Sequence, residues 1–132
     1  MNIALWTVQS FLAAIFAGSG LYKGTQPKQR VVASGQTGVV WYSQPFIRFI
    51  ALAELAGAAG LVLPWLTGRA RVLTPLAAGG LAVIMVGAAA SHARLARQGG
   101  PSRRKELFNV SANIALLGAC SLVAIARAHQ LR

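Results

Sequence analysis

One carboxylate lies inside the most apolar stretch of this 132-residue sequence. Glu54 interrupts the run FIALAELAGAAGLVLPW, residues 49 to 65, which otherwise holds only small and apolar side chains. The chain has just two acidic residues against thirteen Lys and Arg, which gives a net charge of +11. A carboxylate at the centre of a bilayer costs about 2.5–3.5 kcal/mol, so it seldom persists without a purpose. We therefore predict that Glu54 lines a functional site, the alternative being a purely structural hydrogen bond.

Further polar residues are expected near the same end of the apolar segments as Glu54. These residues are Lys23, Arg48, His92, Glu106, Asn109 and Asn113. The last three are spaced i, i+3 and i+7, which puts them on one face of a helix. We interpret Glu54 and His92 as candidate catalytic residues. The candidate ligand-binding residues are Lys23, Arg48, Glu106, Asn109 and Asn113. Simpler roles are also open. The Lys and Arg side chains could extend to the lipid headgroups, and His92 could lie at the membrane interface. The two asparagines could form hydrogen bonds between helices.

Arg48 and Glu54 are six residues apart in the sequence. In a helix this separates them by about 9 Å along the axis and about 120° around it, so we expect no direct pair between them. The Arg48 side chain can still extend toward a shared cavity. Desolvation of Glu54 favours its neutral form, whereas a nearby cation favours the carboxylate.

Four apolar segments must position these side chains, and they cover residues 3–22, 46–66, 75–94 and 107–126. Each has the roughly 20 apolar residues that a helix needs to cross a bilayer. Overall, 55% of the chain is hydrophobic and 11% is charged, less than half of the usual charged fraction of about 25%. The first segment has no Lys or Arg before its long apolar core, unlike a cleaved signal peptide. The sequence predicts an all-α integral membrane protein, an antiparallel four-helix bundle in one domain, residues 1–132.

Proline and glycine give details of these helices. Pro45 and Pro75 are expected at the first helical positions of the second and third spans, with Thr74 as the cap before Pro75. Ala53 with Gly57, and Ala56 with Gly60, form small-xxx-small pairs that let two helices approach closely.

The distribution of Lys and Arg predicts the orientation. Nine of the thirteen lie on the side of the loops at 23–45 and 95–106, and four lie on the other side. By the positive-inside rule both loops face the cytoplasm and both termini lie outside, in a multi-pass protein of the cell membrane.

Several classes of protein fit the sequence poorly. The basic residues gather between apolar runs instead of alternating with aromatic residues on an exposed face, so no nucleic-acid partner is expected. The single Cys120 and two histidines offer no metal-ligand spacing, and the sequence indicates no particular cofactor. No phosphate-binding loop or Ser-His-Asp arrangement is present. A small multidrug exporter would carry its membrane glutamate in the first helix, where this chain has only Gln9.

The segments GSGLYK, PFIRFIALAELAGAAGLVLP and LTPLAAGGLAVIMVGAAASHARL, together with the asparagines of the fourth span, resemble the DoxX-like family of small four-helix membrane proteins. The resemblance covers nearly the whole chain. Its motif positions fall here on Lys23, Arg48, Glu54 and His92. The resemblance implies a membrane redox or oxidative-stress context, with a quinone among the ligands considered. A further, fold-level analogy with sterol-isomerase-like bundles suggests a lipophilic pocket around intramembrane acids.

Two functions remain open on the sequence. In the first, a polar pocket around Glu54 binds a lipophilic small molecule, quinone- or isoprenoid-like, for a membrane redox partner or within a homo-oligomer. In the second, the protein is a membrane enzyme in which Glu54 acts as general acid or base on a lipophilic substrate. Isomerisation, epoxide opening and cyclisation are the reactions considered. Both functions involve contact with the lipid bilayer.

Overall fold

A computed structural model describes residues 2–132, which contain four long helices and two short ones. The long helices are α1 (Ile3–Thr25), α3 (Gln44–Thr67), α4 (Leu73–Arg97) and α5 (Arg103–His129). Each contains one of the four predicted spans, and each is long and apolar enough to cross a membrane. The short helices are α2 (Lys28–Ala33) and η1 (Thr37–Trp41), a 3₁₀ helix. The prediction of an all-α four-helix membrane bundle is confirmed.

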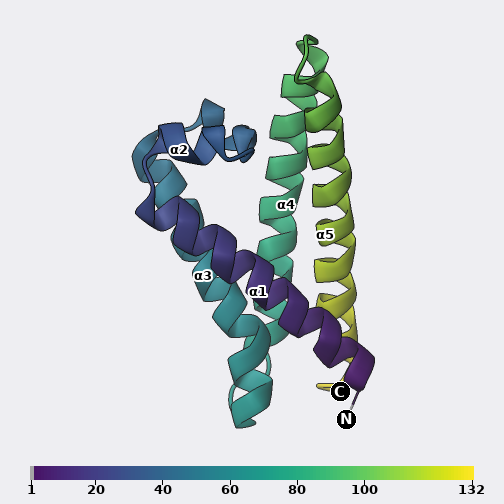
Figure 1. Ribbon diagram of the computed structural model, residues 1–132. Helices are drawn as coiled ribbons and strands as arrows, with labels where there is room; N and C mark the ends of the chain where they lie inside the picture. Colours follow the sequence, from purple (N-terminus) through teal and green to yellow (C-terminus); the bar gives the residue numbers. More distant parts are fainter. Residues whose placement is uncertain (1) are drawn as a thin grey trace.

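The bundle consists of two closely packed helix pairs. α1 packs mainly on α3, α4 packs mainly on α5, and contacts between α3 and α4 join the pairs. α1 meets α5 over only a short stretch, and the two helices diverge toward the end that carries α2 (Figure 1). The main core lies where the pairs meet, around Leu12, Phe16, Leu61 and Leu81. The divergence leaves room inside the bundle at the end that carries α2.

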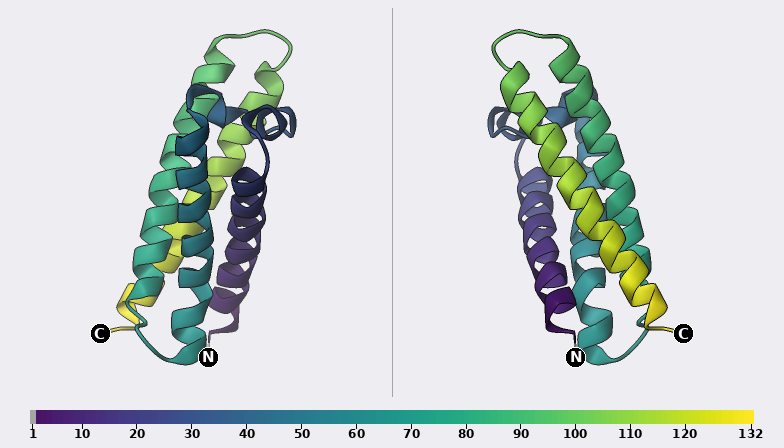
Figure 2. Two further views of the ribbon diagram at one scale, coloured as in Figure 1. Left: turned by 90° about the vertical axis from the view of Figure 1, so that its left-hand side faces the viewer. Right: turned by 90° about the vertical axis from the view of Figure 1, so that its right-hand side faces the viewer.

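The two ends of the bundle differ in their connections (Figure 2). α2, η1 and the turn between α4 and α5 lie at one end, whereas both termini and the α3–α4 turn lie at the other. The two long connections therefore share one end, as the alternation of four spans requires. Val31 and Val39 bury their side chains against Ile47 and so fix the α2–η1 segment to the start of α3. We call residues 28–42, which hold α2, η1 and Tyr42, the cap.

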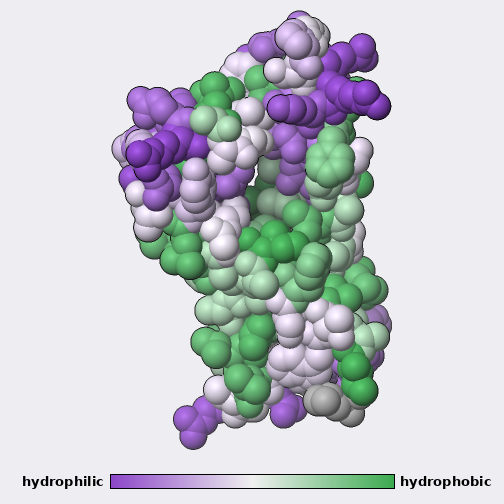
Figure 3. Space-filling model, viewed as in Figure 1, coloured by the Kyte–Doolittle hydropathy of each residue, from purple (hydrophilic) through white to green (hydrophobic). Residues whose placement is uncertain are grey.

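The outer surface is apolar between two polar ends. Large apolar side chains point outward from every long helix, among them Phe11, Leu52, Val83 and Phe108. In Figure 3 an apolar band lies below the polar side chains gathered over α2 and the α4–α5 turn. Such a band suits hydrocarbon and would be unfavourable in water.

The start of α4 differs from the prediction made for it. The helix begins at Leu73, and Thr74 is not its cap but a buried residue of its first turn. Pro64, inside α3, has no N–H and leaves the carbonyl of Gly60 without its helical donor. The hydroxyl of Thr74 donates to that carbonyl over 2.7 Å. Thr74 thus satisfies a backbone acceptor that would otherwise be unpaired in an apolar interior. Pro45 does lie in the first turn of α3, as expected.

Glycines permit the close approach of α3 to its neighbours. A Cβ atom at Gly57 would lie 2.7 Å from the side chain of Leu81, and one at Gly60 would lie 2.6 Å from the Cβ atom of Ala77. On the other side of α3, a Cβ atom at Gly20 would lie 2.8 Å from the carbonyl of Ala51. The predicted small-residue packing therefore occurs, and Leu81 fills the space beside Gly57.

Candidate functional site

A cavity of about 370 Å³ lies beneath the cap, where α1 and α5 diverge. All four long helices and the cap line it. Its apolar wall includes Ile15, Phe16, Phe49, Ile84, Met85 and Leu116. Figure 3 shows a hollow between the polar side chains of the cap and those of α4 and α5. A space of this size, mostly apolar with a few polar groups, is typical of a small-molecule site.

Glu54 and Lys23 form a buried ion pair at the cavity wall. The Nζ atom of Lys23 lies 2.7 Å from Oε1 of Glu54, and the glutamate is 1% exposed. Lys23 belongs to the last turn of α1, and Glu54 to the middle of α3. The other carboxylate oxygen, Oε2, is buried and has no hydrogen-bond partner among residues 2–132. One oxygen is therefore held by the lysine, and the other is left to accept a hydrogen bond from a molecule in the cavity.

His92 and Glu106 form a second buried pair, on α4 and α5. Nδ1 of His92 lies 2.6 Å from Oε2 of Glu106, and the hydroxyl of Thr37 donates to Oε1 of the same glutamate over 2.6 Å. Both carboxylate oxygens act as acceptors, so Nδ1 carries the hydrogen of its bond. The second ring nitrogen, Nε2, then takes the role of acceptor when the imidazole is neutral. A carboxylate that holds one histidine nitrogen fixes the orientation of the ring, as in many acid–base sites.

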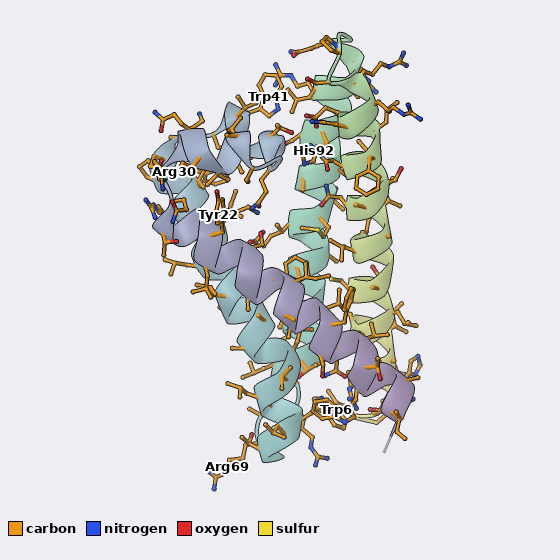
Figure 4. The ribbon with its side chains drawn as sticks, viewed as in Figure 1. Trp6, Tyr22, Arg30, Trp41, Arg69 and His92 are labelled. Atoms are coloured by element: carbon orange, nitrogen blue, oxygen red, sulfur yellow. The ribbon has the colours of Figure 1, made fainter. Side chains whose placement is uncertain are left out.

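The cap closes the cavity through contacts with three helices. The hydroxyls of Tyr42, just after η1, and Ser91 on α4 lie 3.0 Å apart. Ser19 on α1 donates to the side chain of Gln36 over 3.2 Å. Asn109 on α5 donates to the carbonyl of Gly35 over 3.3 Å. His92 lies at the level of the cap, as Figure 4 shows, and a Cβ atom at Gly38 would lie 3.1 Å from its Nε2 atom. Glycine at position 38 thus lets the cap backbone approach the imidazole.

The structure brings six of the seven candidate site residues to this region. Lys23, Glu54, His92, Asn109 and Asn113 line the cavity. Glu106 is buried behind His92 and reaches the cavity through that ring.

Asn109 and Asn113 point to the cavity and away from the outer face of α5, since both line it. The amide of Asn113 donates back to the carbonyl of Asn109 over 2.8 Å. Arg48 is the exception: it is partly exposed near the start of α3 and is not among the lining residues. The cation beside Glu54 is Lys23, from a different helix.

Other polar residues of the site were not singled out in the sequence: Ser19, Gln36, Thr37 and Ser91. None has an unusual side chain, and their hydrogen-bond partners are 17 to 69 positions away in sequence. Tyr42 also lines the cavity. A pair of polar residues in the apolar helices, Ser19 and Ser91, was the only signal available, and serine alone is weak evidence for a site. Within the described residues, no group of three or more His, Cys, Asp or Glu side chains is arranged to hold a metal ion.

The fold and cavity define a multi-pass helical membrane protein with polar groups enclosed beneath a cap. The chain belongs to the DoxX-like family, whose model matches residues 7–124. The match covers α3, α4, the cap and most of α1 and α5, which agrees with the resemblance noted in the sequence. No curated protein and no solved structure matches the chain.

Proposed function

We propose that this protein binds a lipophilic small molecule in the cavity beneath the cap, with Glu54 as the principal polar contact. The observation that carries the proposal is the buried Oε2 atom of Glu54, which has no partner within residues 2–132 although its carboxylate lines an apolar cavity. Leaving a charged acceptor buried and unpaired is costly, and a ligand that donates a hydrogen bond removes that cost.

The polar groups suggest the form of the ligand. Lys23 and Glu54 offer a cation and an acceptor on one wall, and His92 offers a ring nitrogen on another. The remaining wall is built of aliphatic and aromatic side chains. A ring or isoprenoid-like body with one or two oxygen-bearing groups meets both requirements. Quinone-like compounds belong to this class, and a membrane redox or oxidative-stress context remains part of the proposal.

A second candidate is a membrane enzyme, and the His92–Glu106 pair favours it. With Nδ1 bonded to the carboxylate, Nε2 of His92 can accept a proton and the imidazolium so formed is stabilised by Glu106. Glu54, already paired with Lys23, would then accept a proton or orient a hydroxyl on the opposite wall. Such an arrangement suits isomerisation, epoxide opening or cyclisation of an apolar substrate.

The test is to purify the protein in mild detergent and identify the lipophilic compound that accompanies it by mass spectrometry. Glu54→Gln preserves the shape of the side chain but removes its charge, whereas Glu54→Leu also removes the hydrogen-bonding atoms. If the protein is a binder, Glu54→Gln retains most of the compound and Glu54→Leu loses about tenfold or more, the effect of an unmet buried polar contact. If it is an enzyme, Glu54→Gln retains a compound that wild-type protein converts.

A matched control keeps the result interpretable. Leu52, on the same helix, is largely exposed on the outer surface, so Leu52→Gln changes polarity away from the cavity. This variant should retain the compound. If Glu54→Leu retained the compound in full, the Glu54 carboxylate would have no part in either candidate function.

The orientation in the membrane is also proposed. The end that carries the cap and the α4–α5 turn is the more basic, which places it in the cytoplasm by the positive-inside rule. A redox partner or a second copy of the chain would contact this protein within the membrane.

A further inference from the structure

A second polar cluster lies at the end of the bundle opposite the cavity. Arg127, in the last turn of α5, is only 2% exposed. Its Nε atom donates to the side chain of Gln9 over 2.5 Å, and its Nη1 atom donates to the side chain of Gln130 over 2.6 Å. Trp6 lies at this end of the molecule in Figure 4, and its ring centroid is 5.2 Å from the guanidinium carbon. The cluster therefore draws on α1 and α5.

Trp65 brings a second arginine to the cluster. The centroid of its ring lies 4.1 Å from the guanidinium carbon of Arg127 and 4.9 Å from that of Arg71. Two cations thus contact one indole, from the α3–α4 turn and from α5. Their charges repel each other, and stacking on an aromatic ring offsets only part of that repulsion.

No side-chain carboxylate is free to neutralise these arginines. The sequence contains only Glu54 and Glu106, and both are engaged, with Lys23 and with His92. The partners of Arg127 are neutral amides. A buried cation without a counter-charge is strongly unfavourable, even with hydrogen bonds to neutral groups.

Two donors in the cluster are also unused. The Nη2 atom of Arg127 and the Nε1 atom of Trp65 are buried, and neither has a hydrogen-bond partner in the described part of the chain. A buried donor without an acceptor is rare in folded proteins. Two such donors beside two uncompensated arginines are explained together if an anion completes the cluster.

We infer that Arg127, Arg71 and Trp65 form a binding site for a phosphate group, held apart from the cavity. Guanidinium groups match the geometry of phosphate oxygens, and an indole N–H adds a further donor. Gln130 is exposed at the end of α5, so its amide oxygen can give way to a phosphate oxygen at Nη1. The cluster lies at the ends of the spanning helices, the level at which phospholipid headgroups meet a membrane protein. The phosphate belongs either to a phospholipid or to a free phosphate ion.

The test measures binding of dioleoylphosphatidylglycerol to the detergent-purified protein by native mass spectrometry. Dioleoylglycerol, which has the same chains without the phosphate, is the comparison ligand. Arg71 is exposed, so Arg71→Gln removes one cation without disturbing the core. Arg69 lies in the same turn and is equally exposed, which makes Arg69→Gln the matched control.

We expect Arg71→Gln to weaken phosphatidylglycerol binding about fivefold, and Arg69→Gln to change it less than about twofold. Dioleoylglycerol should bind the wild-type protein about tenfold more weakly than the phospholipid. Competition by inorganic phosphate assigns the site to the free ion, and its absence assigns the site to the lipid. Equal losses in the two arginine variants, or equal binding of the two lipids, would overturn the inference.

Discussion

Glu54 and Glu106 occupy different chemical settings although both are buried beneath the cap. Glu106 has both oxygens bonded, to His92 and to Thr37, and it contacts the imidazole through one of them. Glu54 has one oxygen bonded to Lys23 and one unpartnered within residues 2–132. Both oxygens of Glu106 thus have hydrogen-bond partners within the protein, whereas Oε2 of Glu54 has none within residues 2–132. This difference is why Glu54 is the centre of the proposed site.

The Lys23–Glu54 pair leads to a prediction about stability. Lys23→Met should destabilise the protein by about 3–5 kcal/mol, because it leaves a buried carboxylate without its cation. Adding Glu54→Gln to that variant should recover much of the loss, since neither of these two positions then carries a buried charge. Unfolding in mixed micelles with increasing dodecyl sulfate provides the measurement.

Lys105→Met is the control, because Lys105 is exposed at the start of α5. It should change stability by no more than about 0.5 kcal/mol. A double variant as unstable as Lys23→Met alone would show that the pair does not account for the loss.

The position of Glu54 in the lining of an internal cavity was predictable because a lone carboxylate in an apolar run is rare on energetic grounds. The stripe of Glu106, Asn109 and Asn113 followed from helical spacing. The partner of Glu54 was not predictable. Lys23 is 31 positions away on another helix, and only the crossing of α1 and α3 brings it to the carboxylate. Arg48, on the same helix as Glu54, was the nearer cation in sequence but lies outside the cavity lining.

Among the elements, the four spans were predictable from length and apolar composition, and each helix extends beyond its predicted span at one or both ends. The cap was not predictable as a cavity wall. Its sequence between Lys28 and Trp41 is short, with a glycine at 35 whose φ is +105° and another at 38 beside His92. From its sequence alone, such a segment is predicted to be a loop at the membrane interface. Its packing depends on contacts of Val31 and Val39 with Ile47, which belongs to α3.

At the start of α4, a contact with another helix decides the role of a residue that the local sequence predicts to be a cap. Threonine directly before a proline is a typical helix cap, yet the hydroxyl of Thr74 donates a hydrogen bond to the carbonyl of Gly60 on α3. That carbonyl is free because of Pro64. A long-range backbone requirement therefore outweighed a local sequence signal.

Across the whole molecule, the cap and the α4–α5 turn lie at one end and the termini at the other. Single cysteines at Ser34 and Ser102 should therefore label from the same side of a cell membrane, and a cysteine at Arg69 from the opposite side. Cys120 is buried and is replaced by alanine in the background. A membrane-impermeant maleimide applied to intact cells provides the measurement. Labelling of position 34 but not 102 would contradict the arrangement of the spans, and labelling of both from outside would reverse the proposed orientation.

If the cavity beneath the cap holds the lipophilic compound, a side chain that fills the cavity must exclude that compound. Ala88 lines that cavity on α4, and Ala88→Phe would fill much of it. Val83 is 72% exposed on the outer face of the same helix, so Val83→Phe adds bulk without entering the cavity.

The most direct measurement is the amount of compound that each protein retains after purification, determined by quantitative mass spectrometry against protein concentration. We expect wild-type and Val83→Phe proteins to retain equal amounts, and a folded Ala88→Phe protein to retain about tenfold less or none. Equal retention by folded Ala88→Phe and wild-type proteins would show that the compound does not lie in this cavity.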